Sequence, residues 1–140
     1  MKDWIIDGRA VGTSAVDTGL ALVRVIVFLL LVLLHGMSKV PPQEGFVGMV
    51  SGLGFPAPET FAWLAAIAEF GGGILLAIGL LTRPAALLVF VHFLFVIFIA
   101  HAGDGLSDRE LPIIFAVTAL MFLLAGPGRY SVDHLIGRRR

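Results

Sequence analysis

The chain has 140 residues, of which 58% are apolar and 14% charged, and its mean hydropathy is +0.97. A soluble domain with a polar surface cannot sustain this composition, so it predicts a membrane protein with room for four spans and no second catalytic domain. The formal net charge of zero points to no nucleic-acid partner and no acidic substrate, and the absence of cysteine excludes disulfides, thiol redox chemistry and cysteine-ligated metal clusters.

Four apolar segments have a length suited to crossing a bilayer. We expect spans at about residues 17–37, 60–81, 84–102 and 110–126. About twenty largely polar residues precede the first span without the pattern of a cleavable signal peptide, so we expect that span to remain as an anchor. The pattern predicts an all-α, four-helix membrane bundle that forms one domain over residues 1–140.

Prolines, glycines and small polar residues predict where the later spans begin and end. Glu59 or Thr60 would cap the second span, and Pro84 suits the first turn of the third, which follows after a joint of two residues. Ser107 and Glu110 have the spacing of a capping box before the fourth span. That span would end at the sequence "GPG", residues 126–128.

A short helix is expected between the first two spans, lying at the membrane interface. In "QEGFVGMVSGLGF" the apolar side chains of Phe46, Val50 and Leu53 recur at helical spacing behind two prolines.

Basic residues are distributed unevenly between the two sides of the predicted bundle. Lys39 and Arg109 lie on one side. The other side holds Lys2, Arg9, Arg24, Arg83, Arg129, Arg138, Arg139 and Arg140. By the positive-inside rule, this asymmetry predicts that both termini are cytoplasmic.

The first span carries a basic stripe. Arg24 and His35 are eleven positions apart, close to three helical turns, and share a face with Phe28 and Leu31; Lys39 extends the same face. Charged side chains facing lipid are costly, so we expect this stripe to face the interior of the bundle.

The second span places a carboxylate, Glu69, in a row of small residues that includes Gly73 and would let neighbouring backbones approach closely. A buried carboxylate needs a cationic or imidazole partner. Candidates are Arg24 and His35 from the first span, and His92 of the third span, which should lie at a similar depth across the hairpin.

These groups predict one polar chamber between the spans. Glu69 and His92 are the candidate catalytic residues. The candidate cofactor-binding residues are Arg24, His35, Lys39, Glu69 and Gly73.

Structural explanations remain open for the same residues. Glu69 could belong to an ion pair that only fixes the register of the helices, and His92 could form an ordinary hydrogen bond between helices. The side chains of His35 and Lys39 could simply extend toward the membrane interface. His101 is half a turn out of phase with His92 on a straight helix, so we expect no haem held by two histidines of one helix, and no bound metal.

Three stretches resemble the DoxX family of small four-helix membrane proteins. They are "LHGMSKV", "AEFGGGILLAIGLLTRPAAL" and "LLAGPGRYSVD", and the similarity runs from Leu22 to Asp133. The resemblance implies a bacterial or archaeal cytoplasmic membrane protein linked to quinone-dependent redox systems, such as subunits of archaeal thiosulfate:quinone oxidoreductase or partners in bacterial redox-stress complexes. The motif positions that it carries over are Arg24, His35, Gly36, Lys39, Glu69, Gly72, Gly79, Arg83, Gly126, Pro127, Gly128, Arg129 and Asp133.

Three functions follow as hypotheses. In the first, the chain is a quinone-interacting subunit or partner of a membrane oxidoreductase, with quinone as its cofactor. In the second, it is a non-catalytic scaffold that recruits a soluble redox enzyme through Arg83, Arg129 and the terminal arginines. In the third, less supported, it transports a small molecule or lipid. The expected partners are membrane lipid, a redox protein and, given the glycine-rich faces, further copies of the chain.

Overall fold

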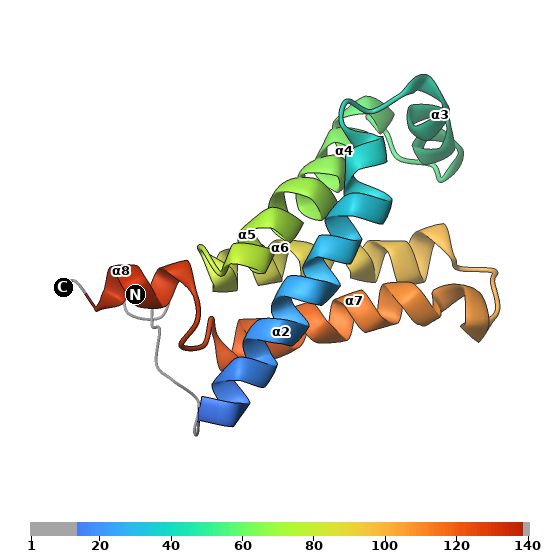
Figure 1. Cartoon of the computed structure of the whole chain (residues 1–140). Helices are drawn as coiled ribbons and strands as arrows, with labels where there is room; N and C mark the ends of the chain where they lie inside the picture. Colours follow the sequence, from blue (N-terminus) through green and yellow to red (C-terminus); the bar gives the residue numbers. More distant parts are fainter. Residues whose placement is uncertain (1–13, 139–140) are drawn as a thin grey trace.

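A computed structural model describes residues 14–138, and every regular element in that range is helical (Figure 1). The first half of this range contains α2 (Ser14–Leu31), η1 (Val32–Gly36), η2 (Met37–Lys39), α3 (Glu44–Gly52), α4 (Pro58–Ala66), η3 (Ile67–Gly72) and α5 (Gly73–Ile78). The second half contains α6 (Thr82–Phe95), η4 (Val96–Ala100), α7 (Leu106–Ala125) and α8 (Val132–Gly137). The all-α prediction is confirmed for the described residues.

Among the residues that the structure describes, three continuous helical rods are long and apolar enough to cross a membrane. They cover Ser14–Lys39, Pro58–Ile78 and Thr82–Ala100. The first three predicted spans coincide with these helices, with ends that differ by a few residues. Their outer surfaces expose large apolar side chains such as Leu22, Leu34 and Phe98, as contact with lipid requires.

Two predicted helix caps are wrong. The second rod begins at Pro58 after Ala57, without a side-chain cap from Glu59 or Thr60, because proline itself suits a first turn. α7 begins at Leu106, four residues before the predicted start, because the chain turns at Gly105. Ser107 consequently lies inside the helix and forms no capping box.

α6 and α7 form an antiparallel hairpin whose partners pack along most of their length (Figure 1). α2 crosses this hairpin and packs against α5. A continuous apolar core joins these helices and includes Phe28 of α2, Leu76 of α5, Val89 of α6 and Phe122 of α7. The rings of Phe28 and Phe122 meet edge to face at 6.0 Å, which connects the first and last long helices.

Two glycines permit the close crossing of the first two rods. A Cβ atom on Gly36 would lie 2.9 Å from both the Cα and the N atom of Phe70, and one on Gly73 would lie 2.6 Å from Cγ2 of Val32. Backbone atoms cannot move aside as a flexible side chain can. The glycines are therefore packing surfaces, as the sequence predicted.

We expect Gly36→Ala to lower the free energy of unfolding by about 1–3 kcal/mol, because overpacking forces the rods apart. Gly48→Ala is the matched control, since Gly48 has open space around its Cβ position in α3. That variant should stabilise the protein by about 0.5–1 kcal/mol through higher helix propensity. Unfolding in bicelles measures both effects, and equal values for the two variants would contradict the crossing argument.

At the opposite end of the rods from α3, a buried cluster joins the first rod, the α5–α6 turn and the C-terminal segment. The Arg24 guanidinium donates hydrogen bonds to the carbonyls of Ala77, Pro127 and Tyr130. Asp133 accepts from the backbone N–H groups of Leu81 and Thr82, both at 2.9 Å, and from the Thr82 hydroxyl at 2.8 Å. We call the residues that carry these side-chain contacts, Arg24, Thr82 and Asp133, the Arg24–Asp133 cluster.

Gly79 is required within this cluster for two reasons. Its φ is +70°, a left-handed conformation, and an added Cβ would lie 2.6 Å from Cβ of Ser131 and 2.9 Å from Cζ of Arg24. Its carbonyl accepts the backbone N–H of Asp133 at 2.9 Å. The turn between the second and third rods is thus built against the C-terminal segment.

Candidate functional site

A cavity of about 590 Å³ lies between the ends of the rods on the side of α3. Its walls come from η1, η2, α3, α4, η3, α6, η4 and α7. α3 is the short helix that the sequence predicted between the first two spans, and its side chains Phe46 and Val50, with Leu53 just beyond its end, line the cavity. These apolar groups therefore cover the space between the rods.

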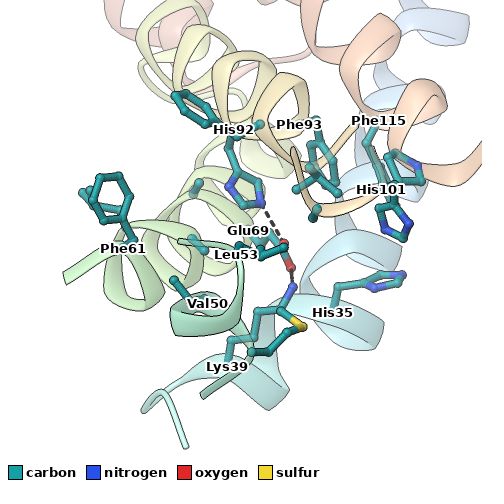
Figure 2. A pocket seen from close by; sticks show the side chains of 18 of the residues that line it. His35, Lys39, Val50, Leu53, Phe61, Glu69, His92, Phe93, His101 and Phe115 are labelled. Carbon is teal, nitrogen blue, oxygen red and sulfur yellow. Dashed lines mark hydrogen bonds and ion pairs between the residues drawn. The ribbon is translucent and has the colours of Figure 1, made fainter. Parts of the chain in front are cut away.

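One carboxylate organises the polar part of this cavity (Figure 2). Glu69 is 2% exposed, and its Oε2 atom lies 2.5 Å from Nζ of Lys39 while Oε1 lies 2.8 Å from Nε2 of His92. The three side chains come from three different rods. We call Lys39, Glu69 and His92 the polar triad.

Glu69 has the kind of partners that we expected for a buried carboxylate, although Lys39 was not among the partners that the sequence suggested. A carboxylate removed from water is costly unless hydrogen bonds and opposite charge offset the lost hydration. Lys39 supplies the opposite charge, and a ring nitrogen of His92 makes the second contact with the carboxylate. The predicted depth match of Glu69 and His92 across the hairpin is confirmed by their contact.

Each rod that borders the cavity contains a π-helical turn there. η1 carries His35, η3 carries Glu69, and η4 begins four residues after His92. A π turn holds one extra residue, which weakens the regular hydrogen bonding and changes the direction of the side chains that follow, and such turns are common at functional sites. The three π turns around one cavity therefore support its assignment as the candidate functional site.

The remaining cationic and imidazole groups lie around the triad. The Nζ atom of Lys39 is 5.4 Å from the centre of the Phe46 ring, so α3 contacts the triad through a cation–π interaction. The His35 ring lines the cavity and meets Phe115 edge-on at 5.8 Å. The first rod, α3 and α7 thus contribute further side chains to the cavity wall around the triad.

His101 also lines the cavity, together with His92 (Figure 2). The prediction that the two histidines face different ways is therefore wrong. That prediction assumes a straight α-helix, but residues Val96–Ala100 form a π turn between His92 and His101. One extra residue in that turn leaves the two about 80° apart around the helix instead of about 180°. The Nδ1 atom of His101 pairs with Oδ2 of Asp104 at 2.7 Å.

The structure therefore brings together His35, Lys39, Glu69 and His92 from the predicted site, and it places Arg24 and Gly73 elsewhere. Arg24 faces the interior, as its stripe predicted, but it lies about 22 Å along the rod from Lys39 and donates to backbone carbonyls. The expectation that it partners Glu69 is wrong. Gly73 contacts Val32 at the rod crossing and is no part of the cavity lining.

Several cavity residues escaped sequence analysis. Phe55 follows α3 in a loop, and Leu111, Pro112 and Phe115 belong to α7. Apolar residues in a membrane chain carry no local signal that separates a cavity wall from a lipid face. Within residues 14–138, no group of three or more histidine, aspartate or glutamate side chains is arranged to hold a metal ion.

Comparisons with known proteins agree with this architecture. The DoxX family model matches residues 19–102, more than half of the chain. Inner membrane protein YphA of Escherichia coli K12 is 28% identical over 123 residues, which cover 81% of this chain and 88% of that protein. Inner membrane protein YqjF of the same strain is 27% identical, with coverage of 88% and 95%. An uncharacterized protein of Haemophilus influenzae is 30% identical, with coverage of 82% and 88%.

No solved structure shows significant similarity to the chain. Three apolar rods of membrane-spanning length and the inner-membrane relatives confirm the predicted location in the cytoplasmic, or inner, membrane. The matched range contains the whole polar triad and His35. On this family-model match, the chain belongs to the DoxX family.

Proposed function

We propose that the protein is a redox-associated membrane component that binds a quinone headgroup at the polar triad. The observation that carries this proposal is a buried carboxylate, held by a lysine and a histidine from two other rods, in the wall of an otherwise apolar cavity. Cavities that are largely apolar and contain a few convergent polar groups are typical of sites for small organic ligands.

The residues present fit such a headgroup. Quinone carbonyls accept hydrogen bonds, and the Lys39 ammonium retains further N–H donors besides the one directed at Glu69. His35 offers a second imidazole in the same wall. Phenylalanine rings supply much of the remaining lining and suit a flat, conjugated ring.

A bound quinone would supply a carrier of two electrons and two protons, with the electrons coming from a partner protein or small reductant. The chain's own residues would then handle the protons. The short contact between His92 and Glu69 would give a proton a path between the two groups, and Lys39 would hold the carboxylate in position. The aromatic lining and α3 limit the access of water to that contact.

We also propose the finer topology. α7, a 20-residue helix that packs along α6, is assigned as the fourth span, and both termini are assigned to the cytoplasm. Of the eight basic residues that support this orientation, Lys2, Arg9, Arg139 and Arg140 lie outside the described residues. The cavity and α3 then lie at the opposite, outer face of the membrane.

Glu69→Gln tests the proposed function. The neutral amide weakens the charged hydrogen bonds that position Lys39 and His92, each worth about 1.5–3 kcal/mol. We therefore expect the quinone that co-purifies with the protein to fall by at least about tenfold. Solvent extraction and chromatography of purified protein in nanodiscs measure quinone per chain.

The control for this experiment is Glu59→Gln, which makes the same chemical change at an exposed position of the same rod. It should retain the wild-type amount of quinone. Equal retention by Glu69→Gln, with circular dichroism showing a folded bundle, would refute the proposed function.

A further inference from the structure

Two apolar stripes face one another across the cavity. One runs along α4 into η3 and consists of Phe61, Leu64, Ala65 and Ala68. The other runs along α6 and consists of Leu88, Val91 and Phe95, with His92 on the same helix face. Both have the i, i+3 or i+4, i+7 spacing of one helix face. They converge on Glu69 and His92, so the space between them leads to the polar triad.

Four side chains of these stripes keep substantial exposure although they line the cavity. Leu64 is 49% exposed, Leu88 39%, Val91 41% and Phe95 46%. Side chains that line a closed cavity would be buried, so this exposure indicates that the cavity is open beside the two stripes. Because these positions belong to membrane-spanning rods, that opening faces acyl chains.

The helix packing explains why an opening exists there. α6 packs closely against α5 and η3, whereas α4 packs mainly against α3 and η3. The second and third rods are therefore joined at the α5 end and separate toward α4, as the diverging rods in Figure 1 show. Small residues, Ala65 and Ala68, leave the widening space unfilled.

Three aromatic rings lie across the α3 end of this opening. Phe55, from the loop after α3, is 4.4 Å from the ring centre of Phe61 on α4 and 6.4 Å from that of Phe95 on α6. We call these three the phenylalanine cluster. The cluster bridges α4 and α6 at the α3 end of the opening. Between the cluster and the polar triad, the rest of the two apolar stripes faces lipid.

We infer that the cavity opens sideways into the bilayer between α4 and α6, and that its ligand is a membrane-dissolved amphiphile. The ligand enters from the acyl phase beneath the phenylalanine cluster, places one polar headgroup at the triad and leaves its tail among the acyl chains. The inference rests on the proposed function only for the identity of the headgroup as a quinone. The route and the amphiphilic class follow from the opening itself.

A tryptophan inside the cavity tests the route without any quinone. Phe93 is buried and lines the cavity, and Phe122 is equally buried in the core but absent from the lining. Phe93→Trp and Phe122→Trp are each made in a background where Trp4 and Trp63 are phenylalanine. Both are reconstituted in vesicles of dibrominated phosphatidylcholine, whose acyl chains quench tryptophan on contact. Phe28→Trp replaces the core variant if Phe122→Trp does not fold.

We expect the brominated acyl chains to quench the tryptophan at position 93 severalfold more strongly than the core tryptophan. Quenching at position 93 by aqueous acrylamide, with no effect of brominated lipid, would mean that the cavity opens to water and would overturn the inference.

Quinone retention is measured on wild-type protein in parallel. Lipid quenching at position 93 without retained quinone supports the sideways opening while the proposed function fails. Retained quinone with acrylamide quenching alone supports the proposed function while the sideways opening fails.

Discussion

Asp133→Ala is expected to destabilise the protein by about 3–5 kcal/mol, because it removes one partner from a buried, charged cluster. The Asp133 carboxylate accepts three hydrogen bonds from Leu81 and Thr82 at the start of α6. It also lies close enough to the buried Arg24 guanidinium for the two charges to interact. Alanine would leave three donors unsatisfied and the guanidinium without that charge. Steric trapping in bicelles measures the free energy of unfolding.

The control for Asp133→Ala is Asp104→Ala. Asp104 also pairs with a basic side chain, the imidazole of His101, but that pair is exposed. Exposed pairs contribute little, so this variant should stay within about 1 kcal/mol of wild type. A loss of similar size at both positions would show that burial in the Arg24–Asp133 cluster has no special weight. The loss of stability in Asp133→Asn should lie between those of Asp133→Ala and Asp104→Ala, since the amide oxygen can still accept one of the three hydrogen bonds.

Lys39→Met is expected to cost about 2–3 kcal/mol, while Lys39→Met combined with Glu69→Gln should return to within about 1 kcal/mol of wild type. The single change leaves a buried carboxylate without its charged partner, which is the costly half of a buried ion pair. The double change replaces both charges with uncharged groups of similar shape. The Lys39 side chain retains 22% exposure, which limits the cost of the single change.

A double-mutant cycle over Lys39 and Glu69 gives the coupling energy between them. We expect a coupling of about 2 kcal/mol, measured from the unfolding of the four proteins under one set of bicelle conditions. Lys39→Arg retains the positive charge and serves as the control, with an expected loss smaller than that of Lys39→Met. Additive losses in the double variant would show that the contact of 2.5 Å carries no net stability.

The composition and order of the apolar segments determined most of the fold. Long apolar runs must become helices in a bilayer, because each backbone N–H and C=O group needs an internal partner. The first three spans and the helix from Glu44 to Gly52 follow from that rule and from helical spacing. A lone carboxylate in the second span also required a nearby cation or imidazole, so Glu69 was identifiable as the centre of a buried polar site.

Helix ends and cavity walls were harder to predict. Whether Ser107 caps α7 depends on where the preceding loop turns, and the turn at Gly105 adds four residues to the helix before the predicted start. Phe55 and Phe115 line the cavity through tertiary contacts, with no local pattern to distinguish them from lipid-facing residues. The assignment of quinone as ligand stays a prediction that Glu69→Gln tests.

The sequence by itself indicated that the basic stripe of the first rod faces inward and that Glu69 needs partners. Only the tertiary structure decided that these partners are Lys39 and His92, while Arg24 belongs to the cluster at the other end of the rods. It also decided that His101 shares the cavity with His92. The physical reason is that a helical repeat specifies a face, whereas the height at which rods cross and the π turns within them depend on packing between segments distant in the chain.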